Sequence, residues 1–321
     1  MLINEKTIKL WSSIGPRATL GLAVNELAKN HDDLVVLTCD VSTSAGLDRF
    51  KKAHPDKYYD IGIAEQNLIG IAAGFASENH NVLTTTFAPF QAIRCCEQIK
   101  VNLGYMKHKI CMVGIASGLV LGNLGFTHCC IEDIGILRSI PNLTIVSPAD
   151  SLEVVKVLQS VLKEKKTSVY IRLTGGANNP IVYNSDYKFV LGKAIELTEG
   201  DDVTIFSSGS MVYQSLQASK LLKEKKINAK VVNMHTIKPI DQDALKGSLN
   251  SKLLVSVEEH NVIGGLGSAI SEKLSEYNNS PKLLTLGVQD EYSGGGDYNH
   301  LLSRHKLDVG SITNQILQNL K

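Results

Sequence analysis

A carboxylate at the start of an apolar helix is the residue of this chain best suited to chemistry. Glu65 follows the short segment 59–62 and precedes a run of small and apolar residues that ends at Ala76. An acid in such surroundings costs free energy unless a partner meets it. Two interpretations stay open from the residues alone. Glu65 either satisfies the free N–H groups of its own helix start, or it hydrogen-bonds a nitrogen atom of a bound ligand.

The elements that position Glu65 follow an alternating pattern. Short β-branched segments alternate with longer helical patterns, such as the helix predicted over 150–164, and this is typical of an open, mostly parallel α/β sheet. A stretch rich in Gly, Asn and Pro interrupts the alternation. We therefore predict two such α/β domains, over 1–175 and 187–321, joined by a linker over 176–186. Strands are predicted at 34–37, 82–85, 110–113, 143–146, 168–171, 203–206, 229–232 and 252–257.

The composition excludes several classes of function. The 33 basic and 32 acidic residues leave a formal net charge of +1, which gives no reason to expect nucleic acid or an anionic membrane as a partner. No apolar run approaches the length of a membrane span, and residues 1–6 lack the layout of a signal peptide. The six cysteines lack zinc-ligand spacing. We expect a cytoplasmic protein with reduced thiols.

The segment Gly62-Ile63-Ala64-Glu65 resembles the Gly-x-x-Glu signature of the pyrimidine-binding domain in transketolase-like, thiamine-diphosphate-dependent enzymes. The resemblance implies that Glu65 donates a proton to N1′ of the cofactor's aminopyrimidine ring, which helps to deprotonate the thiazolium C2. The segment 86–90 matches the family's Thr-Phe-x-x-Phe turn. Phe90 would then stack on the aminopyrimidine, and Phe87 and Ile93 would wall the same pocket. Without the resemblance, both phenylalanines could be ordinary core residues.

The resemblance also implies a substrate site. Residues 125–128 are similar to the family's Gly-x-Thr-His loop, so His128 would face the reacting carbons and move a proton. Three further residues match positions that grip the phosphate end of a sugar, and a surface ion pair or a turn is the alternative for each. These residues are Arg17, Ser44 and Arg172.

The chain departs from the usual transketolase pattern at the substrate end. Leu124 stands where the family carries an acid, and Ala116 or Ser117 falls near a usual histidine. We therefore expect a different ketose donor or acceptor. Glu132 and Asp133 begin the next predicted helix and are interpreted as N-terminal caps.

The second half carries a motif of its own. Residues 257–267 resemble the Glu-Glu-His and Gly-Gly-x-Gly turn of the transketolase C-terminal domain. We interpret these glycines as a tight turn between a strand and a helix.

The diphosphate half of a thiamine-diphosphate site is missing from this sequence. The family normally holds Mg²⁺ and the diphosphate with a Gly-Asp-Gly motif and a later Asn, and no Gly-Asp-Gly occurs here. The chain thus resembles the C-terminal section of a split transketolase. The resemblance implies a partner subunit, an N-terminal transketolase section that supplies the diphosphate site and Mg²⁺, in a heterotetramer with two copies of each chain.

The leading functional hypothesis is transfer of a two-carbon ketol unit between sugar or sugar-phosphate substrates in carbohydrate metabolism. The β chain of a 2-oxo-acid dehydrogenase and a split deoxyxylulose-phosphate synthase are alternatives with related chemistry. A non-catalytic regulatory subunit and a domain that binds another flat heterocycle are alternatives of other classes.

Overall fold

The computed structural model describes residues 1–164 and 166–320. Its strands are β1 Leu34–Thr38, β2 Tyr58–Asp60, β3 Asn81–Phe87, β4 Ile110–Ile115, β5 Leu143–Val146, β6 Ser168–Arg172, β7 Ile195–Thr198, β8 Val203–Ser207, β9 Ala229–Asn233, β10 Thr236–Lys238, β11 Leu253–Asn261 and β12 Leu283–Val288. Its α-helices are α1 Glu5–Leu27, α2 Asp48–Ala53, α3 Glu65–Ser77, α4 Ala88–Ala92, α5 Cys96–Ile99, α6 Asp133–Arg138, α7 Ser151–Glu164, α8 Met211–Glu224, α9 Gln242–Lys246, α10 Leu266–Leu274, α11 Tyr298–Arg304 and α12 Val309–Asn319.

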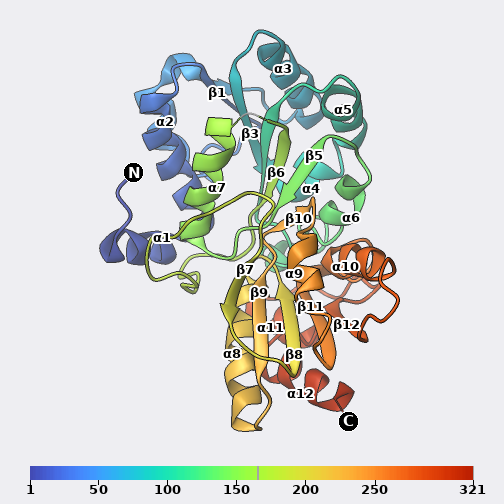
Figure 1. Ribbon diagram of the computed structural model, residues 1–321. Coiled ribbons are helices and arrows are strands. Elements are labelled where there is room, and N and C mark those ends of the chain that lie inside the picture. Colours follow the sequence, from blue (N-terminus) through green and yellow to red (C-terminus); the bar gives the residue numbers. More distant parts are fainter. Residues whose placement is uncertain (165, 321) are drawn as a thin grey trace.

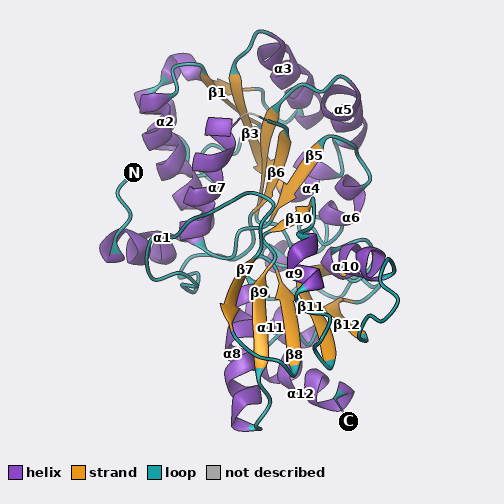
Figure 2. Cartoon of the chain, in the orientation of Figure 1, coloured by secondary structure: helices purple, strands orange, loops and turns teal. Residues whose placement is uncertain are grey.

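Two twisted sheets lie one above the other along the molecule (Figure 1). In the described residues the first sheet has the order β10-β5-β6-β4-β3-β1-β2, and the second has the order β12-β11-β8-β9-β7. Most neighbouring strands are parallel, and only the edge strands β10 and β7 run antiparallel to their neighbours. Helices flank both sheets (Figure 2). The prediction of two open, mostly parallel α/β units is confirmed.

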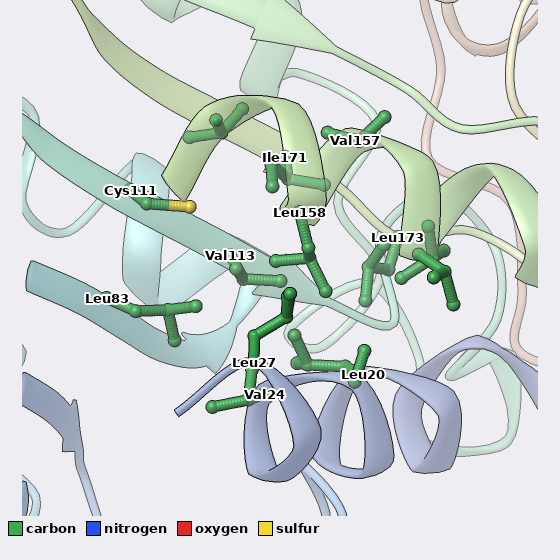
Figure 3. Packing of buried hydrophobic residues seen from close by; sticks show 14 of the residues in the cluster. Leu20, Val24, Leu27, Leu83, Cys111, Val113, Val157, Leu158, Ile171 and Leu173 are labelled. Atoms are coloured by element: carbon green, nitrogen blue, oxygen red, sulfur yellow. The ribbon is translucent and has the colours of Figure 1, made fainter. Parts of the chain in front are cut away.

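The core of the first sheet explains why its strands read as continuous apolar runs. Strands β1, β4, β5 and β6 are buried along their whole length, as expected for parallel strands covered on both faces. Helices α1 and α7 cover one face together, where Leu20 and Val24 meet Leu158 above the strand residue Val113 (Figure 3). The eight predicted strands and the predicted helix at 150–164 are all confirmed, within a few residues at their ends.

The predicted linker has no helix or strand in the structure but is firmly packed. The carboxylate of Asp150 accepts hydrogen bonds from the backbone N–H groups of Val182 (2.8 Å) and Tyr183 (3.0 Å). The N–H group of Asn178 donates to the carbonyl oxygen of Ser13 at 3.0 Å. The segment is therefore fixed to the first half of the molecule along much of its length.

Strand β10 was not predicted, and it crosses between the halves. It comes from the second half of the sequence and pairs antiparallel with β5 at the edge of the first sheet, with Thr236 opposite Val146. A strand of three residues is too short to show an alternating pattern. The two sheets are therefore connected by strand pairing as well as by the linker.

Candidate active site

Glu65 is buried because of its place on helix α3. Side chains three, four and seven positions apart share one face of a helix, and these positions after Glu65 hold Leu68, Ile69 and Ala72, all fully buried. The Glu65 side chain is itself only 3% exposed. The predicted burial of an acid at the start of this helix is therefore confirmed.

The turn before α3 holds Glu65 in place. Gly62 has a φ of +73°, a conformation that side chains with a Cβ rarely adopt. The carboxylate of Asp60 accepts hydrogen bonds from the N–H groups of Gly62 (3.0 Å) and Asp40 (2.9 Å). Within residues 1–164 and 166–320, the hydrogen-bond partner of the Glu65 carboxylate is Arg94 and not an N–H group of its own helix. The capping interpretation of Glu65 does not describe this structure.

Arg94 is the neighbour of Glu65 that sequence reasoning missed. Its Nη1 donates to Glu65 Oε2 at 2.6 Å, and its side chain is 41% exposed. The guanidinium carbon also lies 4.1 Å from the centre of the Phe90 ring, a cation–π contact. The signal was available, because Arg94 follows Phe90 by four residues and this spacing brings side chains together around a helix.

Phe87, Phe90 and His128 form one aromatic cluster, as the resemblance implied. Phe87 ends strand β3, and Phe90 follows in the short helix α4. The two rings meet edge to face at 6.4 Å, and the His128 ring lies 5.6 Å from Phe90 and 6.4 Å from Phe87. The Nδ1 atom of His128 is hydrogen-bonded to the hydroxyl of Thr127 at 3.0 Å. A chain of contacts thus runs from His128 through Phe90 and Arg94 to Glu65.

Ile93 lies at the end of α4, between Phe90 and Arg94 in the sequence, and is 39% exposed. Its predicted role as a pocket wall stays a prediction.

Arg17 and Ser44 lie near each other at the start of the first sheet. Gly15 has a φ of +82° and, together with Pro16, interrupts α1 just before Arg17. The turn that contains Ser44 packs against this point, because a Cβ placed on Gly46 would lie 3.0 Å from the carbonyl oxygen of Arg17. In the part of the chain that the structure describes, the Arg17 guanidinium has no hydrogen-bond or ion-pair partner, and burial lowers its pKa. Such a group is available to an anion.

Arg172 is wrongly predicted as a substrate residue. It lies in strand β6, is 2% exposed, and its Nε donates to the carboxylate of Asp133 at 2.9 Å. Its Nη2 donates to the carbonyl oxygens of Cys130 (3.1 Å) and Glu259 (2.7 Å). Burial disfavours the Arg172 charge, but Asp133 and Glu259 outweigh burial and raise its pKa. The guanidinium is enclosed and occupied, so it holds the fold together instead of a phosphate.

The predicted caps at Glu132 and Asp133 are also wrong. The Glu132 side chain makes no capping bond to α6, and it accepts a hydrogen bond from Tyr292 at 2.6 Å instead. Asp133 is fully buried and binds Arg172 and Tyr170. These two acids connect distant segments rather than stabilise their own helix.

The residues present fit the pyrimidine half of the implied cofactor. A planar nitrogen heterocycle needs an acid beside aromatic faces in surroundings of low polarity, and Glu65 with Phe87 and Phe90 supplies these features. Among residues 1–164 and 166–320, no group of three or more His, Cys, Asp or Glu side chains is arranged to hold a metal ion. None of the helices in that same part of the chain is long and apolar enough to cross a membrane.

Comparison with known proteins gives the same picture for both halves. Residues 12–179 match the model of the transketolase pyrimidine binding domain, and residues 192–312 match that of the transketolase C-terminal domain. One of the two subunits of an apulose-4-phosphate transketolase from Phocaeicola vulgatus is 37% identical over 92% of this chain and 94% of its own length. A 6-deoxy-6-sulfo-D-fructose transketolase subunit from a Clostridium species is 36% identical over 89% of this chain and 88% of its own.

One solved structure extends the likeness to three dimensions. It is described as a split gene transketolase in an inactive beta4 tetramer, and it is 34% identical with a TM-score of 0.85. The match covers 96% of this chain and 98% of that one.

Proposed function

The chain belongs to the transketolase family, and on that premise we propose that it is one subunit of a split transketolase. Its reaction transfers a two-carbon ketol unit from a ketose to an aldose, with thiamine diphosphate as the cofactor. The observation that carries this proposal is the buried carboxylate of Glu65 in contact, through Arg94 and Phe90, with His128. The relatives that this chain matches along nearly their whole length are transketolase subunits, which favours this proposal over the related synthase and dehydrogenase alternatives.

Each residue of the candidate site has a distinct task in this proposal. Glu65 holds a proton at N1′ of the aminopyrimidine, and the low polarity around it strengthens that hydrogen bond. Phe87, Phe90 and Ile93 orient the ring. Thiamine diphosphate, when bound, supplies the carbon nucleophile that carries the ketol unit. His128 donates to a substrate hydroxyl or carbonyl group and moves a proton.

The proposed substrates are anionic sugars. The free guanidinium of Arg17 and the neighbouring Ser44 would bind the anionic end of the substrate, because an arginine fork matches phosphate oxygens. The names of two relatives give a sugar phosphate and a sulfo sugar as their substrates. Leu124 is exposed in the loop that carries His128, where the family pattern has an acid, which fits a ketose that differs from the usual donors.

A partner chain completes the proposed site. The sequence has no Gly-Asp-Gly motif, so we place the diphosphate and Mg²⁺ on an N-terminal transketolase section. Two copies of each chain form the proposed heterotetramer. In this arrangement, residues 1–175 form the pyrimidine-binding domain, 176–186 the linker and 187–321 the C-terminal domain. The similar split-gene structure, described as an inactive beta4 tetramer, agrees with a partner requirement.

Reconstitution tests this proposal. The chain is purified alone and together with the product of a neighbouring transketolase-like gene, and ketol transfer is measured with thiamine diphosphate and Mg²⁺. We expect activity from the mixture and negligible activity from the chain alone. Robust activity of the chain alone would refute the shared site.

The substitution Glu65→Gln separates an enzyme subunit from a regulatory one. It should abolish activity in the assembled complex without preventing assembly, as measured by size-exclusion chromatography with light scattering. Glu78→Gln, at the opposite and exposed end of the same helix, is the control and should keep activity. A fully active Glu65→Gln complex would mean that this chain is a scaffold.

A further inference from the structure

The loop that carries His128 is built into the second half of the molecule. The side chains of Leu119 and Ile131 belong to the hydrophobic cluster of the second sheet, together with Val255 and Leu301. Phe126, inside the same loop, packs at the edge of that cluster. Because the flanking side chains are anchored there, the second half has a direct hold on the loop that precedes α6.

The base of this loop is closed by a pair of backbone hydrogen bonds. The N–H group of Gly118 donates to Cys130 O at 2.8 Å, and that of Cys130 donates to Gly118 O at 2.9 Å. These bonds leave residues 119–129, with His128 among them, as a closed loop. Strand β11 holds both sides of the base: Leu119 N–H donates to Glu259 Oε1 at 2.7 Å, and Asn261 N–H donates to Ile131 O at 2.8 Å.

Glu259 is placed for this contact at a cost. Its carboxylate is 1% exposed, and burial raises its pKa although the hydroxyls of Ser210 and Tyr298 donate to it. Gly118 has a φ of +69°, and a Cβ there would collide with Glu259 Oε1. An acid that is buried, fully bonded and pressed against the base of a loop fixes the position of that loop.

The second half also contacts the outer part of the loop. The Gly296 N–H group donates to Gly122 O at 3.1 Å. The Tyr292 ring lies 5.3 Å from the Phe126 ring, and its hydroxyl donates to Glu132 at 2.6 Å. The loop is thus held at its base and farther out by the same half of the molecule.

We infer that Glu259 is a positioning residue for His128, so that the C-terminal half sets where the substrate-facing histidine lies. The role of His128 toward substrate rests on the proposed function, whereas the hold of Glu259 on the loop does not. The motif around Glu259, interpreted from sequence only as a tight turn, thereby acquires a function in the candidate site.

Glu258 provides a matched control. It is adjacent to Glu259 and also 1% exposed, and its carboxylate accepts hydrogen bonds from Leu266 N–H (2.6 Å) and Gly267 N–H (2.8 Å) at the start of α10. It makes no hydrogen bond to the His128 loop among the described residues. Replacing either acid removes a buried carboxylate, but only the replacement of Glu259 should release the loop.

Amide hydrogen exchange of the full chain, measured by mass spectrometry, tests the structural part. Glu259→Ala should accelerate exchange in peptides covering 119–129 by about tenfold, and leave 265–274 unchanged. Glu258→Ala should do the reverse. Unchanged loop exchange in Glu259→Ala, or equal loop acceleration in both variants, would overturn the inference. If Glu259→Ala does not fold, Tyr298→Phe replaces it, with about threefold faster loop exchange expected and no change as the contrary result.

A double-mutant cycle in the assembled enzyme tests the catalytic consequence. Glu259→Ala should lower kcat/KM in the wild-type background, but by no more than about twofold when His128 is already alanine. Glu258→Ala should retain the wild-type kcat/KM. Fully additive losses would show that Glu259 acts elsewhere. If the wild-type assembly transfers no ketol unit, the proposed function fails, and the exchange experiment still decides whether Glu259 holds the loop.

Discussion

Arg94 binds both groups that a pyrimidine ring would use, so replacing it should change cofactor binding in a defined direction. Its guanidinium contacts the Glu65 carboxylate and lies over the Phe90 ring. A ring that stacks on this face of Phe90 and bonds Glu65 must displace it. We therefore expect Arg94→Met to bind thiamine diphosphate more tightly in the assembled enzyme, because the competing contacts are gone.

The size of this effect follows from the exposure of the ion pair. A fully buried pair that loses one partner costs about 3–5 kcal/mol, but Arg94 is 41% exposed and solvent screens its charge. About 1 kcal/mol for such a pair and about 0.5 kcal/mol for an exposed cation–π contact give about 1.5 kcal/mol. This corresponds to about tenfold in the dissociation constant. The free chain should lose stability by a similar amount.

Isothermal titration of the assembled enzyme with thiamine diphosphate measures the affinity, and urea unfolding of the free chain measures the stability. Arg138→Met is the matched control, because Arg138 pairs with Glu272 at 2.5 Å outside the candidate site. It should lower stability without changing the dissociation constant. Weaker cofactor binding by Arg94→Met would refute the reasoning, since Arg94 would then support the bound state instead of competing with it.

Three further outcomes are expected. Arg17→Gln should raise KM for an anionic sugar substrate by at least about tenfold, with little change in kcat, because the lost bonds are made to a non-reacting end of the substrate; steady-state kinetics measure it. Arg172→Met should lower the free energy of unfolding by about 3–5 kcal/mol, because it leaves the buried Asp133 carboxylate without its cation, and any folded fraction should keep its KM; denaturant titration with kinetics on the soluble fraction decides this. Burial lowers the pKa of His235 to about 4 from its ordinary 6.5, so the unfolded chain gains that proton first and stability should fall by about 3 kcal/mol as pH drops from 6.5 to 4; thermal melts across this window should show a flatter dependence for His235→Gln.

The sheet strands could be predicted because buried parallel strands are written as short apolar runs. Residues 34–37 and 110–113 are examples, and both form fully buried strands. Strand β10 could not be found this way, because its three residues pair at an edge and follow no period. Its position depends on the packing of the two halves, which local patterns do not encode.

The candidate site was predictable where a residue's role follows from its own element. Glu65 is buried because its helix spacing puts it on the apolar face, and that spacing is visible in the sequence. Arg172 was misjudged because its role depends on Asp133, which lies 39 residues away in the chain. A charge inside the apolar run 169–173 was nevertheless a warning, because a fully buried strand accepts an arginine only when it is paired.

Strand β10 has a consequence for how this protein is made. Until residue 238 leaves the ribosome, strand β5 remains the open edge of the first sheet, and open edges invite pairing with other chains. The nascent chain therefore exposes an adhesive edge while about 90 residues after β5 are still being synthesised. A gene cut at the linker would leave that edge uncovered for good. Natural or engineered fragmentation of this chain should therefore yield an aggregating first half, even though its core is complete.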